Sequence, residues 1–353
     1  MTFSYPDAQI PVVFSANSSA IRVNSSRSAE VKISVSFNGG YYGLVTLTDK
    51  SGTVLIDLKA ILQGVAQISP FQYLLLNHLE AYQFTPNVTL RGEFSDGSSP
   101  ESLDIRCLPG GIVADGSIPV PLNKPLTHRP IISTTHSDGL ELLPFILSER
   151  LSYGFVTARV RESSGKITSI ILPVSLPDGG SHPYLLLLDC SLSRILHEMH
   201  YAVVASDVIS YDIVFNGEIR HRFFVSKESA QCFIFRNTMG AYDTIYATGV
   251  TGRTLDKEFS FSKKEHTDIP IPSEALDKIS INSGCLVSDE EINQWHDFLA
   301  SNEQYIYEGG NLYQIIIDDA DAETKKGALS TIAFTYHKAE RLLVRAYKDD
   351  IIK

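Results

Sequence analysis

The sequence predicts a mainly β protein: tandem duplicated β-sandwich domains followed by a C-terminal β-rich domain with one short helix. Three observations predict this fold class. Short strand-like segments are separated by turn residues about every ten positions. Several of these segments recur in the same order, and the pattern changes after residue 243. A chain of 353 residues is long enough for two or three domains that each bury a core.

Alternating apolar and polar residues mark the strands. In residues 31–37, Val-Lys-Ile-Ser-Val-Ser-Phe, every second residue is apolar, which is the period of a half-buried strand. Further segments of strand character are residues 44–47, 88–94, 155–160, 167–172 and 213–219. Turns are expected at Asn38-Gly39-Gly40, Lys50-Ser51-Gly52, Ser95-Asp96-Gly97 and Asn216-Gly217.

An internal duplication is the basis for the domain assignment. Residues 43–46, 55–57, 88–94 and 105–106 recur as residues 154–157, 187–189, 213–219 and 235–236. Such a long period indicates two tandem domains rather than a solenoid. We assign them to residues 1–117 and 118–243, with an insertion in the second copy near residues 166–186. The two copies should share a topology, with Asp57 and Asp189 at the start of equivalent short helices.

The third domain, residues 244–353, has the clearest helix signal. Ser288 and Glu291 form a capping-box pattern at the start of residues 289–300. Trp295 and Phe298 follow at helical spacing and predict a buried face. Residues 305–307 and 312–315 read as a hairpin, and a later strand follows an acidic loop that begins at residue 318.

Composition argues against several function classes. The formal net charge is −11, which disfavours nucleic-acid binding because phosphate contacts need clustered Lys and Arg. The four cysteines share no close spacing, so a zinc ribbon or a redox motif is not indicated. The N-terminal residues lack the pattern of a signal peptide and no apolar run has the length of a membrane span. We therefore expect synthesis in the cytoplasm and no membrane insertion.

The sequence contains segments that partly resemble catalytic or metal-binding motifs. The sequence His197-Glu198-Met199-His200 spaces its histidines three apart instead of the four that a zinc protease helix requires. The acidic residues 318–323 lack the turn glycine of a calcium loop, although ion binding there stays open beside a solvated loop. Asp57 and Asp189 are better explained as helix caps than as an acid–base pair. We expect no enzyme activity, no cofactor, no catalytic residue and no metal ligand.

The most informative segment is residues 231–244. An apolar run at Cys232 to Phe235 predicts a buried strand, and a polar turn then leads to an aromatic residue and an aspartate. The positions Phe235, Asn237, Gly240, Tyr242 and Asp243 form the pattern aromatic-x-Asn-x-x-Gly-x-aromatic-Asp. This pattern resembles a segment of tail and baseplate structural proteins of bacterial viruses, particularly those of gut Bacteroidota. An ordinary β-turn is the alternative interpretation.

The order of elements up to about residue 340 also resembles the end of those tail proteins. The first copy departs from the pattern, because Cys107-Leu108-Pro109 stands where the second copy has Asn237-Thr238-Met239. The resemblance implies a virion structural protein, made in the host cytoplasm. It would act as a scaffolding subunit of a tail, baseplate or tail-adaptor ring, in contact with copies of itself and with other virion tail proteins.

Interface candidates follow from this resemblance and from tyrosine-rich strands. The candidates are Asn237, Gly240, Tyr242, Asp243, Tyr305, Tyr307 and Tyr313. An exposed cluster of the last three tyrosines would form a subunit interface or a carbohydrate platform. The alternative function is a glycan-binding β-sandwich protein, an adhesin or binding module, with a host-surface glycan as its ligand.

Overall fold

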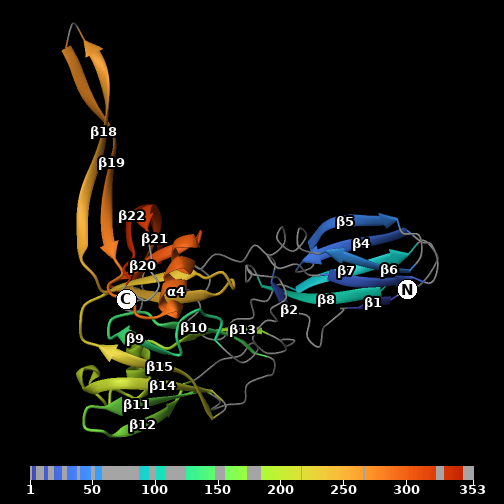
Figure 1. The fold of residues 1–353 in the computed structure, drawn as a ribbon, viewed down its shortest axis with the longest axis horizontal. Coiled ribbons are helices and arrows are strands. Elements are labelled where there is room, and N and C mark those ends of the chain that lie inside the picture. The colour runs from blue at the N-terminus through green and yellow to red at the C-terminus, as the bar shows by residue number, and fades with distance from the viewer. Residues whose placement is uncertain are drawn as a thin grey trace, which may run out of the picture.

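The structure, a computed structural model, describes residues 2–4, 12–14, 20–25, 30–37, 40–48, 52–57, 87–94, 101–108, 125–147, 156–172, 184–215, 217–264, 267–322 and 330–344 (Figure 1). Within these ranges the chain is mainly β, which confirms the predicted fold class. No helix among the described residues is long and apolar enough to cross a membrane.

The first sandwich consists of two sheets. One contains β1 (Thr2–Ser4), β3 (Ala20–Ser25) and β6 (Gly52–Asp57). The other has the order β2-β8-β7-β4-β5, formed by Val12–Phe14, Glu101–Leu108, Asn87–Phe94, Glu30–Phe37 and Gly40–Thr48. All neighbours in this second sheet are antiparallel except β2 and β8. The helix expected after Asp57 lies outside the described residues.

The second sandwich also has two sheets. Its outer sheet has the order β12-β11-β14-β15-β9, formed by Ile167–Ile171, Val156–Glu162, Val208–Phe215, Glu218–Ser226 and Ile132–His136. Its inner sheet pairs β10 (Leu142–Leu147) with β13 (Tyr184–Asp189). Helix α3 (Leu192–Glu198) and the 3-10 turn η1 (Ala205–Asp207) connect β13 to β14.

The two sandwiches repeat one topology strand by strand. Strands β2, β3, β4, β5, β6, β7 and β8 correspond in chain order and in pairing to β9, β10, β11, β12, β13, β14 and β15. In both copies the first of these strands lies parallel to the last. The arrangement is that of an immunoglobulin-like sandwich, in which the C, F and G strands share one sheet and the B and E strands the other. The duplication is therefore a repeat of a whole domain.

The strand correspondence corrects two of the sequence anchors. Residues 105–106 lie in β8, which corresponds to β15, whereas residues 235–236 lie in β16, outside the repeat. Residues 43–46 lie in β5, which corresponds to β12 and not to β11. Short apolar runs look alike in any strand, so they fix the repeat less well than pairing does. The anchor at Asp57 and Asp189 is correct, since these residues end the equivalent strands β6 and β13.

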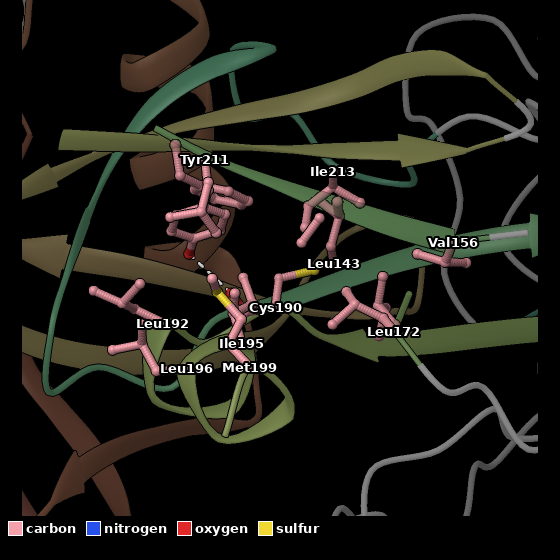
Figure 2. Packing of buried hydrophobic residues seen from close by; sticks show 14 of the residues in the cluster. Leu143, Val156, Leu172, Cys190, Leu192, Ile195, Leu196, Met199, Tyr211 and Ile213 are labelled. Carbon is pink, nitrogen blue, oxygen red and sulfur yellow. Dashed lines mark hydrogen bonds between the residues drawn. The ribbon is translucent and has the colours of Figure 1, made fainter. Parts of the chain in front are cut away.

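Apolar residues of both sheets and of α3 form the core of the second sandwich. Every second residue of β11, beginning with Val156, faces this core. The Tyr211 hydroxyl in β14 donates a 2.8 Å hydrogen bond to the Cys190 carbonyl oxygen, which ties the strand to the end of β13 (Figure 2). A buried tyrosine that bonds back across this corner is a feature of immunoglobulin-like sandwiches. The fourth residue of the corresponding strand β7 is Leu90, so the first copy has no tyrosine there.

The C-terminal sheet contains seven strands in the order β17-β16-β20-β21-β22-β19-β18. They are Tyr242–Ala247, Gln231–Arg236, Gln304–Glu308, Asn311–Asp321, Ala333–Val344, Thr267–Asn282 and Thr251–Lys264. The boundary predicted between residues 243 and 244 falls inside β17, so the hydrogen-bonded sheet continues across it. The predicted hairpin of residues 305–307 and 312–315 is confirmed as β20 and β21.

Helix α4 (Asp289–Ala300) covers one face of the C-terminal sheet, and the predicted capping box is confirmed. The Ser288 hydroxyl accepts the Glu291 N–H at 3.1 Å, and the Glu291 carboxylate accepts the Ser288 N–H at 3.2 Å. The acidic residues 318–321 were expected in a loop, but they continue strand β21 beside β22. Asp318 is held there by the His337 ring nitrogen at 3.0 Å.

The opposite face of the C-terminal sheet packs on the inner sheet of the second sandwich. Leu142 and Leu187 of the inner sheet share an apolar cluster with Ile234, Tyr242 and Leu312. The neighbouring residues Leu143 and Leu188 face the core of the second sandwich. The inner sheet is thus apolar on both faces, which explains its uninterrupted apolar sequences. It joins the second sandwich to the C-terminal sheet.

Candidate functional site: a buried polar junction

The Asn237–Asp243 segment forms the turn between β16 and β17. The Asn237 N–H donates to the Ala241 carbonyl at 2.8 Å, and the Gly240 N–H donates to the Asn237 carbonyl at 2.8 Å. Gly240 has φ +79°, a conformation that glycine adopts without the steric cost a side chain would bring. The Asn237 side chain accepts the Ala241 N–H at 3.0 Å and donates to the Leu126 carbonyl at 2.7 Å. The turn therefore binds the segment that leads into the second sandwich.

Asp243, the second residue of β17, continues this attachment. Its carboxylate accepts hydrogen bonds from the Arg129 guanidinium at 3.0 Å, from the Thr127 hydroxyl and from the Thr244 N–H. Arg129 also donates to Glu141 and to the Thr244 carbonyl. Arg129, Glu141 and Asp243 are all buried. We call these three residues, together with Asn237 and Asp297 described below, the polar junction.

The electrostatics of the polar junction depend on one cation between two carboxylates. Burial raises the pKa of Glu141 and of Asp243, although Arg129 acts to lower both. Burial alone would lower the pKa of Arg129, but the two carboxylates raise it, so the guanidinium stays charged. Breaking such a buried group leaves a charge without compensation. The arrangement thus makes the contact between β17 and the second sandwich specific.

Helix α4 enters the polar junction through Asp297. Its carboxylate accepts the Thr238 N–H at 2.7 Å, and its second oxygen lies 3.7 Å from the His128 ring nitrogen. Burial, and then the nearby Asp243, raise the pKa of Asp297 to about 7. Burial lowers the pKa of His128. The Asn237–Asp243 turn is therefore contacted on one side by residues 126–129 and on the other by the helix.

The tyrosine candidates do not form one exposed cluster. Tyr242 and Tyr305 are buried in the apolar cluster against the inner sheet, and Tyr307 packs at its margin. Tyr313 is the register partner of Ile306 and therefore lies on the opposite face of the sheet. There the Lys338 ammonium lies 4.4 Å from the centre of its ring. The sequence grouping was wrong because it counted separation along the chain without the period of two in a strand.

Sequence reasoning found the turn but missed its partners. Arg129, Glu141 and Asp297 come from a proline-containing linker, a strand start and a helix, which are far apart in the sequence. One local signal was available: Glu141 lies between Leu140 and Leu142 in an apolar run. A carboxylate at such a position is rarely buried without a paired cation.

A hollow of about 380 Å³ adjoins the polar junction, lined in part by Arg129, His136, Tyr246, Gln294 and Trp295. Trp295 itself is buried, and the Gln294 side chain donates to the Thr244 carbonyl at 2.9 Å. Among the described residues, no three or more His, Cys, Asp or Glu side chains are grouped so as to hold a metal ion. The interactions of the polar junction are structural in kind: they fix two domains and a helix around one turn.

No protein-family model matches this chain, and no curated protein matches its sequence.

Proposed function

We propose that this protein is a scaffolding subunit of a phage tail, baseplate or tail-adaptor ring. The observation that carries the proposal is the Asn237–Asp243 turn. Its sequence resembles a segment of tail structural proteins, and every polar position of the pattern has a structural task. Asn237 and Asp243 bind the second sandwich, while Gly240 permits the turn.

A scaffold must transmit force and position between its contacts, which requires rigid connections between domains. The polar junction and the apolar cluster at Leu142 and Tyr242 supply such a connection. Removing one partner of a buried ion pair is strongly destabilising, so the polar junction penalises separation of the two parts, and the apolar cluster contributes the burial. The second sandwich and the C-terminal sheet would therefore behave as one body within the ring.

The experiment is direct detection of the chain in particles. Virions induced from a host that carries the gene would be purified and their proteins identified by mass spectrometry. Electron microscopy of particles with an affinity tag on the chain would then locate it. We expect the chain in the tail or neck at a fixed copy number, and tailless or unstable particles when the gene is deleted. Virions that lack the chain, with normal tails after the deletion, would contradict the proposal.

Glycan binding is a second candidate, and the hollow beside the polar junction favours it. Polar and aromatic residues that converge on a concave surface are typical of small-ligand sites. Binding of the purified chain to an oligosaccharide array, lost in a Gln294→Ala variant that keeps its fold, would support this candidate. An array without any bound oligosaccharide would count against it.

A further inference from the structure

Strand β12 is an edge strand of the outer sheet of the second sandwich. It pairs with β11 through residues 157–161 and 167–171, and among the described residues no strand pairs with its other side. Figure 1 shows β12 at the margin of the second sandwich, away from the C-terminal sheet. Such an edge presents backbone N–H and C=O groups to a further strand. We call this side of β12 the free edge.

The backbone hydrogen bonds to β11 show which residues of β12 point to the free edge. The Lys166 carbonyl accepts an N–H from β11, and the Leu172 N–H donates to a carbonyl of β11, each at 2.9 Å. Residues of an antiparallel pair alternate between hydrogen-bonded and non-hydrogen-bonded positions. The N–H and C=O groups of Ile167, Ser169 and Ile171 therefore point away from β11, to the free edge.

The free edge is complementary to itself. Antiparallel pairing of two β12 strands about a two-fold axis at Ser169 places Ser169 opposite Ser169 and Ile167 opposite Ile171. Each of these pairs can exchange both N–H···O bonds. The Ile167 and Ile171 side chains are 53 and 47% exposed, and in this register each packs beside an isoleucine of the other copy. The sequence Ile-Thr-Ser-Ile-Ile thus matches its own reversed copy at every residue that points to the free edge.

β12 lacks the devices that keep other edge strands apart. It contains no proline and no charged residue, and its register with β11 has no bulge. The preceding Lys166 pairs with Glu162 at 3.5 Å. Arg159, the register partner of Ser169, is three strand spacings from its counterpart in the second copy, about 14 Å. This separation exceeds the screening length of about 8 Å at physiological salt, so the arginines do not oppose the contact.

We propose that two copies of this chain associate through their free edges, which joins the two outer sheets into one continuous sheet. The contact is isologous, because the same residues serve in both copies. The five residues of β12 are fewer than the roughly 20–30 residues that each side of a standard interface contributes, so the dimer is weak and concentration-dependent. The inference goes beyond the scaffolding proposal, since the free edge is the same whether or not the chain is part of a virion.

The first test is a charge exchange at the two-fold axis of the purified full-length chain. Ser169→Lys and Ser169→Glu each place like charges directly opposite each other, and each should weaken self-association at least about tenfold at low salt. An equimolar mixture of the two variants should associate again, because opposite charges then face each other. Sedimentation velocity over a concentration series measures both effects. The control pair, Ser163→Lys and Ser163→Glu in the exposed turn before β12, should associate like the unchanged chain.

A second test examines the register. Ser169→Cys should give a disulfide-linked dimer under mild oxidation, because a residue on the two-fold axis meets its own counterpart with Cα atoms about 5.5 Å apart, within the range of a disulfide. Cys285, an exposed free cysteine, is replaced by serine in the parent chain. Ser163→Cys in the same parent is the control and should give no more linked dimer than the parent itself.

Three outcomes would overturn the inference: a chain that stays monomeric at all accessible concentrations, a mixture of the Ser169 variants that associates no better than either alone, or equal cross-linking of the Ser169→Cys and Ser163→Cys chains. Thermal melts identify variants that fail to fold, and Ser169→Cys, which exchanges one atom, keeps the register test available in that case. The particle experiment tests the scaffolding function separately, so either proposal can fail without the other.

Discussion

The two edges of the C-terminal sheet are treated in opposite ways. At one edge, β17 is held by the second sandwich: the Thr244 hydroxyl accepts the Leu142 N–H and donates to the Leu140 carbonyl, each at 3.0 Å. Asp243 adds its bond to Arg129. At the other edge, β18 pairs with β19 alone in the described residues. The β17 edge is thus closed by contacts within the chain, whereas the β18 edge is open among the described residues, and open edges favour association.

The β17 edge and the β18 edge of the C-terminal sheet differ in what covers the edge strand. The closed edge buries charges that satisfy one another, which fixes a single geometry. The open edge is formed by the β18–β19 hairpin, which pairs with β22 only at residues 279–282 and projects from the sheet (Figure 1). Among the described residues, the two edges are thus distinguished by whether another part of the chain packs on the edge strand.

The largest loss of stability is expected when Arg129, the cation at the closed edge, is removed. Arg129→Ala leaves Glu141 and Asp243 buried without a cation, and we expect a loss of about 3–5 kcal/mol of unfolding free energy. Urea unfolding followed by tryptophan fluorescence measures it, since Trp295 lies in α4. The matched control is Arg222→Ala, whose pair with Asp212 is partly exposed and should cost about 1 kcal/mol or less. Equal losses in both variants would mean that the polar junction does not hold the domains.

The second effect concerns the turn itself. Asn237→Ala removes the bond to the Leu126 carbonyl and the acceptor for the Ala241 N–H. With two buried partners left unsatisfied, we expect a loss of about 2–3 kcal/mol. Amide hydrogen exchange should show faster exchange in β17 and in residues 125–130, with β11 unchanged. Exchange that increases equally everywhere would argue that the turn has no special role in this contact.

Much of the fold followed from local pattern. The strand at Phe233, the capped helix at Ser288 and the hairpin at Gly309 each depend on residues close in sequence. The projection of the β18–β19 hairpin from the sheet could not be predicted in this way, although the strand at residues 254–261 was recognised. Nothing local distinguishes a strand that joins a wide sheet from one that projects with a single partner, because only pairing decides this.

The residues of the polar junction likewise divide into those that local sequence predicts and those that only the fold brings together. The motif positions Asn237, Gly240 and Asp243 were found because turn chemistry is local. Their partners Arg129 and Asp297 were not, because pairing across more than 50 residues depends on how the sheets stack. The interface role of the motif residues stays a prediction. Their side chains are already engaged within the chain, so a subunit contact there would involve neighbouring surface.

The third effect is a dependence of the unfolding free energy on pH, caused by Asp297 beside the closed edge. The pKa of Asp297 is raised from 3.8 to about 7, so the folded state binds a proton more tightly than the unfolded state. Its contribution therefore favours folding at low pH and is lost as pH rises from about 4 to about 7. Asp297→Asn keeps an acceptor for the Thr238 N–H and cannot ionise. Above pH 7 it should be more stable than the unchanged chain by on the order of 2 kcal/mol.

The measurement is urea unfolding of both proteins between pH 5 and pH 8.5. The gain from Asp297→Asn should shrink as pH falls, and the variant should show the flatter profile. His296→Ala, an exposed change one residue away in α4, is the control and should follow the unchanged chain. A constant difference at every pH would show that the substitution acts through packing and not through ionisation.

The smallest expected effect concerns the open edge, the β18–β19 hairpin. Asp256 and Leu276 are register partners, so residues 257–275 can be replaced by Asn-Gly, a pair suited to a two-residue hairpin turn. Because a two-stranded ribbon alone adds little stability, the melting temperature should change by less than about 2 °C, equivalent to under about 1 kcal/mol. If the melting temperature instead fell by more than about 5 °C, the β18–β19 hairpin would be packing on its own chain, and the contrast between the two edges would fail.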